Sequence, residues 1–303
     1  MIGAGDVLVD SHVHFWQRDR FAYRWLDGEG GALQRDFMPV DLVADLAAPD
    51  AVPLSACVFV QADCRADQSV DEARWVQELA TSGAPVLAIV AHAPLELGGA
   101  CADRLDELLH AADLVSGVRR LLQDEPAGFA SSPAFVEGVR QLGPRGLSMD
   151  LCVRQHQLPE VTELVGLCPE VLFVLDHCGK PRLTDSGFDQ WAADLARLAS
   201  HPHVRCKLSG LATEAPADAR AGLSLRPWLE RALELFGPER CMFGSDWPVL
   251  TSATTYRDWY DVVLHAIDDL TDTEKGGVMG GVALATYDPD NRAARAKEGG
   301  PWP

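Results

Sequence analysis

Short apolar runs typical of buried β-strands recur along the chain, and segments with helical periodicity separate them. The first run covers residues 7–13, and seven more follow at 54–61, 86–91, 117–122, 146–153, 171–176, 204–208 and 240–243. The clearest helical patterns lie at 102–113, 157–167, 188–199, 225–236 and 255–268. Eight βα units within 303 residues are typical of a closed (β/α)8 TIM barrel rather than an open sheet.

Local start signals agree with this alternation. At Ser69 and at Thr271, glutamate follows three residues later, which is the capping-box pattern of a helix N-terminus. Ser132 precedes Pro133, which pairs an N-cap residue with proline at the first helical position. A nucleotide-binding open sheet would carry a glycine-rich loop after its first strand, but residues 14–17 read His-Phe-Trp-Gln.

No internal repeat or linker divides the sequence, so we expect residues 1–303 to form a single barrel domain. Residues 17–40 are long, aromatic and punctuated by proline, without helical periodicity. Such a segment predicts either a wall or lid of the active site or an aromatic patch packed over the barrel mouth. Residues 288–303 are rich in proline, glycine and charge, and we expect them to form a tail.

The composition argues against several classes of partner. A net charge of −19 disfavours nucleic acid and anionic membrane surfaces, both of which require a basic face. No apolar run approaches the roughly 20 residues of a membrane span, and no basic segment precedes the first apolar run as in a secretory signal. We therefore expect a small-molecule partner, no nucleic acid and no membrane; oligomeric state stays unknown.

The eight cysteines do not form any C-x-x-C pair. Five lie in or beside β-like runs, namely Cys57, Cys152, Cys178, Cys206 and Cys241. This distribution is typical of reduced, buried thiols in a cytoplasmic enzyme, not of a disulfide framework or a zinc ribbon.

His12 and His14 directly follow the apolar start of the first run. In a strand, residues i and i+2 project from one face about 7 Å apart, so both imidazoles enter the same space. A metal, a carbonyl oxygen or a shared water could occupy it. Because the active site of a TIM barrel lies at the C-terminal strand ends, these positions are the ones to examine.

The other expected strand ends add further polar side chains to this pair. They are Gln61, His92, Arg119, His177, Glu214 and Asp246. One histidine at a strand end is commonly structural. Three histidines with a carboxylate at the same rim instead indicate a functional site.

These residues fall in motifs that resemble a known family. Asp10-Ser11-His12-Val13-His14-Phe15-Trp16, Leu175-Asp176-His177-Cys178-Gly179-Lys180-Pro181 and Gly244-Ser245-Asp246-Trp247-Pro248 occur in the order seen in the amidohydrolase superfamily. The chain most resembles its sugar-acid lactonase branch, typified by L-fuconolactonase and L-rhamnonolactonase. The resemblance spans nearly the whole chain and also includes residues 23–26, 122–125 and 206–215. A lone H-x-H pair would be weak, whereas the ordered set is specific.

The resemblance raises the question of a metal. Superfamily members with metal centres add a Lys or Glu on strand 4 and a His on strand 5, where this chain has Arg119-Arg120 and a Ser-Met-Asp-Leu-Cys run. A binuclear centre is therefore not expected. His12, His14, His177 and Asp246 could still hold one zinc with an open position. Because the lactonase branch works without metal and Arg119 is cationic, we expect no required cofactor, with one Zn²⁺ as the alternative.

The resemblance also implies a mechanism for hydrolysis of an aldonolactone. Either Glu214 or Asp246 would activate water as the general base, and the sequence leaves the choice open. His12, His14 and His177 would donate hydrogen bonds to the carbonyl oxygen.

Substrate binding is predicted for six residues, each with a packing role as the alternative. Arg119 and Gln61 match polar positions of the lactonases, and Trp25 and Trp247 could stack on a sugar face. His92 and Arg120 depart from the family pattern, which has Gly-Trp after strand 3 and Arg-His after strand 4. Arg120 would suit a lactone carrying a carboxylate or sulfonate, or else lie on the surface.

Two other functions remain open. One keeps the barrel but performs zinc-dependent amide hydrolysis or decarboxylation, as other amidohydrolase branches do. The other is a non-catalytic sugar-binding barrel.

Overall fold

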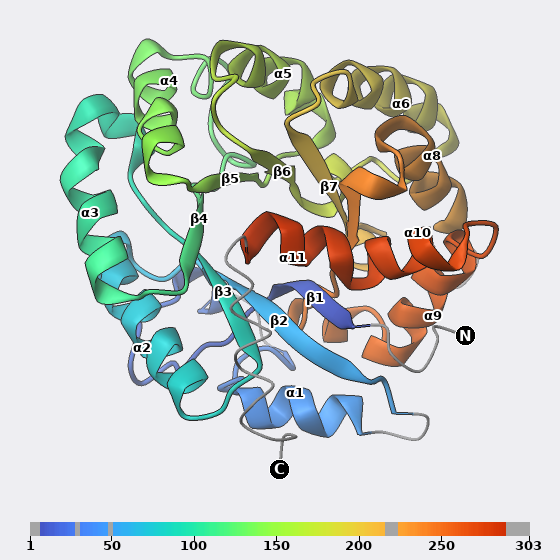
Figure 1. Ribbon diagram of the computed structural model, residues 1–303, viewed down its shortest axis with the longest axis horizontal. Coiled ribbons are helices and arrows are strands. Elements are labelled where there is room, and N and C mark those ends of the chain that lie inside the picture. The colour runs from blue at the N-terminus through green and yellow to red at the C-terminus, as the bar shows by residue number, and fades with distance from the viewer. Residues whose placement is uncertain (1–6, 28–30, 48–50, 216–223, 289–303) are drawn as a thin grey trace.

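The computed structural model describes residues 7–27, 31–47, 51–215 and 224–288. Eight parallel strands form one sheet in which each strand pairs with the next along the chain. The strands are β1 (Leu8–Val13), β2 (Leu54–Val60), β3 (Val86–Ala91), β4 (Val115–Arg119), β5 (Ser148–Leu151), β6 (Phe173–Leu175), β7 (Val204–Leu208) and β8 (Cys241–Phe243). Helices follow them around the outside (Figure 1), so the predicted (β/α)8 barrel is confirmed.

The outer helices are α1 (Pro39–Leu46), α2 (Ser69–Thr81), α3 (Ala102–Ala111), α4 (Pro133–Arg140), α5 (Leu158–Leu167), α6 (Asp185–Ala199), α8 (Arg226–Phe236) and α9 (Tyr256–Ala266). A short helix, α7 (Leu211–Glu214), follows β7 directly. The chain then forms α10 (Asp272–Gly276), a π-helical turn (Gly277–Gly281) and α11 (Val282–Tyr287).

The barrel closes between the first and last strands. The Asp246 N–H donates to His12 O at 2.9 Å, and the His14 N–H donates to Trp247 O at 2.8 Å. Since these residues come directly after β8 and at the end of β1, the closure joins two of the predicted functional motifs.

The opposite end of the barrel is covered by the C-terminal helices. In Figure 1, α11 lies across the strands, and its Ala283 and Tyr287 belong to the apolar cluster formed by interior strand residues such as Val9 and Val60. At Gly280 a β-carbon would lie 1.9 Å from Val7 O, so only glycine allows this close approach to the start of β1.

Two of the three predicted helix starts are confirmed. The Ser132 side chain accepts from the Phe135 N–H, and Thr271 and Glu274 form a capping box. The capping box at Ser69 is wrong, because a short 3-10 turn precedes α2 and places Ser69 inside the helix with its hydroxyl unbonded. Glu72, the expected second member, is buried and bonds elsewhere.

Strands 4 and 5 are shorter than the apolar patterns indicated. Pairing in β4 ends at Arg119 opposite Asp150, so residues 120–122 lie beyond the strand. The apolar side chain of Leu122 is buried there by packing outside the sheet, which is why it resembled strand sequence.

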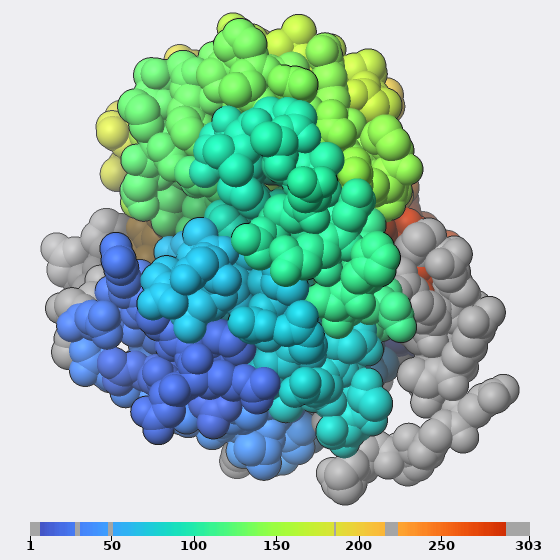
Figure 2. All heavy atoms as spheres, turned by 90° about the vertical axis from the view of Figure 1, so that its left-hand side faces the viewer, coloured from blue at the N-terminus to red at the C-terminus, as the bar shows by residue number. Residues whose placement is uncertain are grey.

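The described part of residues 17–40 packs against the loop between β2 and α2. The Ala22 N–H donates to Gln68 Oε1 at 2.9 Å, the Arg65 N–H donates to Ala22 O, and Trp25 Nε1 donates to Ala62 O at 2.8 Å. In Figure 2 the dark-blue spheres of this segment lie directly beside the lighter blue ones. Residues 28–30 of the predicted wall and 289–303 of the predicted tail lie outside the described residues.

All eight cysteines are unpaired and buried, as their positions in the sequence predicted. Within the described ranges, no helix has the length and apolarity needed to cross a membrane.

Glu72 joins the wall segment to the barrel in an unusual way. Its Oε1 accepts from the Tyr23 hydroxyl at 3.3 Å and from the Ala62 N–H at 3.4 Å, and the side chain has no salt bridge among the described residues. Burial is the main reason that its pKa is raised from 4.5 to about 7.

We predict that Glu72→Gln removes a pH dependence of stability. A carboxyl whose pKa is higher in the folded than in the unfolded state costs stability as pH rises through 4.5 to about 7. Between about pH 5 and about pH 8, the free energy of unfolding of the wild type should therefore fall by on the order of 3 kcal/mol relative to that of the variant. Urea unfolding measures this difference. Glu78→Gln, at an exposed position of α2, is the control and should track the wild type. If the difference in unfolding free energy between the wild type and Glu72→Gln stays the same across this pH range, the prediction is contradicted.

Candidate active site

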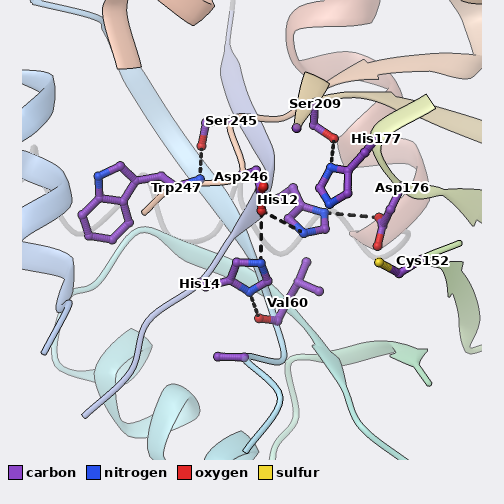
Figure 3. Close-up of polar contacts among 12 residues, drawn as sticks. His12, His14, Val60, Cys152, Asp176, His177, Ser209, Ser245, Asp246 and Trp247 are labelled. Carbon is purple, nitrogen blue, oxygen red and sulfur yellow. Dashed lines mark hydrogen bonds and ion pairs between the residues drawn. The ribbon is translucent and has the colours of Figure 1, made fainter. Parts of the chain in front are cut away.

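The C-terminal ends of β1, β6 and β8 bring three imidazoles around one carboxylate. Asp246 Oδ1 lies 3.4 Å from His14 Nε2 and 3.7 Å from His12 Nε2. The ring of His177 lies 4.5 Å from that of His12 between centroids. Figure 3 shows the four side chains pointing toward one another, so the cluster predicted from the motifs is assembled in the structure.

The backbone at this cluster is held in uncommon conformations. Asp246 has φ of 65° and His177 has φ of 53°, both in the left-handed region that non-glycine residues rarely adopt. Gly210, with φ of 65°, passes so near His177 that a β-carbon would lie 2.3 Å from its Nδ1. Such strain persists where surrounding structure enforces it, and it is concentrated at functional sites.

Asp246 is held as an anion although it is only 5% exposed. Burial alone would raise its pKa, but His177, a hydrogen bond from His14 and the nearby His12 outweigh burial and hold the pKa well below its usual range. The opposite holds for two of the histidines, because burial lowers the pKa of His177 to about 4 and that of His12 well below 6.5. At neutral pH the site therefore presents a carboxylate beside neutral His12 and His177.

Hydrogen bonding distinguishes the three imidazoles. Nδ1 of His14 lies 2.7 Å from Val60 O, which can only accept, so Nδ1 carries the proton. Arg119 Nη1 lies 3.2 Å from His12 Nε2 and can only donate, so a neutral His12 carries its proton on Nδ1, toward Asp176. His177 Nδ1 lies 2.8 Å from the Ser209 hydroxyl, which can donate or accept; in the tautomer in which Ser209 donates, the His177 proton lies on Nε2.

A second layer of buried charges, which the sequence analysis did not identify, supports the cluster from below. Asp176 lies 3.2 Å from His12 Nδ1 and forms ion pairs with Arg119 at 3.4 Å and with Lys207 at 3.0 Å. Lys207 also pairs with Asp150 at 2.5 Å. Asp150 and Lys207 could have been found from the sequence, because both are charged residues within strands expected to be wholly buried. Charged side chains are almost never buried without partners.

Arg119 and Gln61 lie together beside the cluster. Arg119 Nη2 donates to Gln61 O at 2.6 Å, and Gln61 Oε1 accepts from the Asp63 N–H. Two buried donors are left without a partner among the described residues, Gln61 Nε2 and Arg119 Nε. Unpaired buried donors are costly, so this pair is suited to receive acceptor atoms of a bound molecule.

Glu214 lies at the rim and its side chain is 23% exposed. It pairs with Lys180 Nζ at 3.4 Å, and Lys180 also donates to Gln123 Oε1 at 2.7 Å. The charges of Glu214 and of Asp246 both help to raise the pKa of Lys180 against the effect of burial. Lys180 thus lies within electrostatic reach of both candidate bases.

Arg120 turns away from the cluster toward acidic partners. It pairs with Glu96 at 3.1 Å and Glu125 at 2.6 Å, and its guanidinium lies over the Phe129 ring. His92 is partly buried near it, and burial followed by the charge of Arg120 lowers the His92 pKa to about 4. The charge of Arg120 is therefore balanced within the protein.

The two predicted stacking residues differ in exposure. Trp25 is partly buried and packs edge-on against Trp16. Trp247 is fully buried, with Nε1 donating to Asp45 Oδ2 at 2.7 Å, and Figure 3 shows its indole on the side away from the histidines.

The donor atoms match the spacing of a single zinc ion. Ligand atoms about 2.1 Å from a tetrahedral zinc lie about 3.4 Å apart, close to the separations of Asp246 Oδ1 from His14 and His12. His12, His177 and Asp246 present ligand atoms within 4.8 Å of one another. The Nδ1–H of His14 binds a backbone carbonyl, as metal-bound histidines do. Against the ion, the Arg119 guanidinium already contacts the Nε2 lone pair of His12.

Comparison with known proteins identifies relatives over almost the full length. L-fucono-1,5-lactonase from Burkholderia multivorans is 36% identical over 297 residues, covering 93% of this chain and 96% of that protein. L-rhamnono-gamma-lactonase from Scheffersomyces stipitis is 28% identical over 54% of this chain and 56% of its own length. A crystal structure of an amidohydrolase from Burkholderia multivorans with bound zinc superimposes with a TM-score of 0.82 at 36% identity, covering 93% and 99% of the two chains.

The model of the amidohydrolase family (Amidohydro_2) matches residues 9–288, from the start of the H-x-H strand to the end of the described structure. The motifs, the barrel and this match lead to one conclusion: the chain belongs to the amidohydrolase family.

Proposed function

We propose that this protein hydrolyses a small sugar-acid lactone, a 1,4- or 1,5-lactone of the L-fucono or L-rhamnono type, to the open-chain acid. The observation that carries the proposal is the ionised Asp246 carboxylate among three imidazoles, with the Arg119 guanidinium in the same cluster. The lactonases among the relatives support this reaction class.

Hydrolysis of a lactone requires an activated water and stabilisation of the oxyanion that forms on the carbonyl oxygen. Asp246 is our preferred general base, because it is ionised and lies inside the cluster. Glu214 is the alternative, supported by the resemblance of its segment to the lactonases, but it forms an ion pair with Lys180 at the rim. Either carboxylate must lie within hydrogen-bond reach of the attacked water.

We assign stabilisation of the oxyanion to different groups from those expected from the sequence, which were His12, His14 and His177. His177 with its proton on Nε2 can donate to the carbonyl oxygen, and Arg119 brings a full positive charge close to it. Neutral His12 uses its single N–H on Asp176, and the Nδ1–H of His14 is used on Val60 O. We therefore assign donation to His177 and Arg119, and orientation of Arg119 and Asp246 to His12 and His14.

The charge balance of the rim favours an uncharged lactone. Arg120 is paired with two glutamates and Lys180 with one, so neither offers an unpaired cation to a carboxylate or sulfonate. Gln61 Nε2 supplies a free donor for a ring or hydroxyl oxygen, and the partly exposed Trp25 is the better placed of the two tryptophans for a sugar face.

A single zinc ion, if bound, would be held by His12, His14, His177 and Asp246 and would supply Lewis-acid polarisation of the carbonyl. We favour the metal-free reaction because Arg119 already places positive charge at His12 Nε2. Zinc-dependent hydrolysis is the second candidate, favoured by the ligand spacing and by the zinc in the related amidohydrolase structure.

We predict that the purified protein turns over neutral aldonolactones and that Asp246→Asn abolishes most of the activity. A lactone panel with a pH indicator gives the rates. Removing a general base should lower kcat by about 10²–10⁴-fold, while Glu214→Gln should cost less. A larger loss in Glu214→Gln than in Asp246→Asn would assign the base to Glu214. No turnover of any lactone by a folded protein would refute lactone hydrolysis, and sugar binding that survives Asp246→Asn would then indicate a non-catalytic barrel.

We also predict that removal of metal leaves lactone hydrolysis intact. The protein is dialysed against a chelator, its zinc content is measured by mass spectrometry, and the lactone rates are compared before and after. Rates should be unchanged, since Arg119 and His177 stabilise the oxyanion. A rate that falls to background and returns with stoichiometric Zn²⁺ would support the zinc-dependent alternative instead.

A further inference from the structure

His92 is a partly buried histidine at the rim whose side chain has no partner of its own. Its imidazole forms no hydrogen bond, ion pair or ring contact with any residue that the structure describes. Arg119 carries a second group of this kind, because its Nε–H is buried and without a partner in the same part of the chain. Two polar groups that the protein itself leaves unpaired are suited to bind a ligand together.

The order of the strands places His92 beside the guanidinium of Arg119. In the sheet β3 lies between β2 and β4, and Arg119 Nη2 reaches from the end of β4 across β3 to Gln61 O, after β2, at 2.6 Å. Ala91 lies opposite Val118 in the parallel pairing of β3 with β4. The next residues on the two strands, His92 and Arg119, therefore come level at the rim.

The alternation of side chains along β3 directs His92 toward the barrel interior. Val90 belongs to the apolar cluster inside the barrel, whereas Ala91 belongs to the other apolar core. Successive side chains of a strand point to opposite faces, so His92 follows Val90 on the inner face. This is the face from which the Arg119 side chain reaches the site, since its guanidinium contacts His12.

The two unpaired groups differ in what they can bind. Arg119 Nε–H can only donate a hydrogen bond. Burial, followed by the charge of Arg120, lowers the pKa of His92 to about 4, so at neutral pH its ring is uncharged and has one nitrogen that accepts. A hydroxyl satisfies both, because its oxygen accepts from Arg119 while its O–H donates to His92. A ring oxygen or a carboxylate only accepts.

We propose that His92 is a specificity-determining residue which, with Arg119 Nε, binds the hydroxyl next to the lactone carbonyl. The guanidinium is a rigid planar fork, and its Nη1 contacts His12 beside the proposed position of that carbonyl. An oxygen bound at Nε therefore belongs to the adjacent part of the substrate, which in an aldonolactone is the hydroxyl on carbon 2. The choice of this hydroxyl rests on the proposed lactone hydrolysis, whereas the binding of a ring hydroxyl by His92 does not.

Kinetics with two matched lactones test the proposal. L-fucono-1,4-lactone is compared with its 2-deoxy counterpart, and the wild type should favour the hydroxylated lactone in kcat/KM by about tenfold or more, because the other leaves buried polar groups unpaired. His92→Phe keeps an aromatic ring but cannot form the hydrogen bond, so this preference should fall about tenfold. His92→Gln retains a donor and an acceptor and should keep more of the preference than His92→Phe.

His110→Phe is the matched control. His110 is an exposed histidine of α3 whose Nδ1 lies 2.6 Å from Asp106 O, on the outside of the barrel. Its variant should show the same preference between the two lactones as the wild type. A wild type that does not discriminate between them, or His92→Phe with an unchanged preference, would overturn the proposal.

A binding measurement on the wild type does not depend on the folding of His92→Phe or on turnover. The ring C–H resonances of His92, assigned with the help of His92→Gln, are followed by NMR during titration with 1,4-anhydro-L-fucitol, an unreactive cyclic ether, and with its 2-deoxy analogue. We expect a shift with the first compound and a much smaller one with the second. Equal shifts, or none, would contradict the proposal.

The two readouts separate this proposal from the proposed function. A hydroxyl-dependent shift of His92 in a protein that hydrolyses no lactone would uphold the hydroxyl site and refute lactone hydrolysis. Lactone turnover with a preference that does not depend on His92 would uphold hydrolysis and refute the hydroxyl site.

Discussion

Two backbone hydrogen bonds between the first and last strands determine most of this site. Asp246 N–H to His12 O and His14 N–H to Trp247 O close the barrel, and they set the H-x-H motif against the strand 8 carboxylate. Because the bonds involve the main chain, the imidazoles and Asp246 meet whatever molecule is bound. Asp246 and His177 both have left-handed backbone conformations here, and only a glycine at position 210 leaves room for the His177 ring.

The interior of the barrel is balanced in charge without help from solvent. Asp150 and Asp176 face Lys207 and Arg119, and all four side chains are at most 6% exposed. Neutral His12 lies between this balanced group and Asp246, with Nδ1 3.2 Å from Asp176 and Nε2 3.7 Å from Asp246. A proton on the wrong nitrogen of His12 would place two donors, its Nε2–H and Arg119, against each other.

The sequence predicted the barrel and the cluster because both arise from local pattern. Strand and helix periodicity identified the βα units, and positions at strand ends identified His12, His14, His177 and Asp246. Features that depend on side-chain direction across the barrel were not predictable in this way. Trp247 adjoins Asp246 in sequence but points to the opposite side, and Glu72 matched a capping box yet turned into the core. Lys207 and Asp150 become partners only through strand order, since 57 residues separate them.

Arg119 explains how one scaffold could accommodate hydrolysis with or without a metal. A zinc ion bound by His12 would place its charge beside Nε2, and the guanidinium places one positive charge 3.2 Å from the same atom. Both stabilise an oxyanion electrostatically, but only the guanidinium is tied covalently to the barrel and needs no free ligand lone pair. In the proposed reaction, an arginine at the end of strand 4 would compete with the ion for His12 and supply positive charge in its place. Asp176 and Gln61 O hold the guanidinium, so the buried ion pair with Asp176 helps to fix where its charge lies.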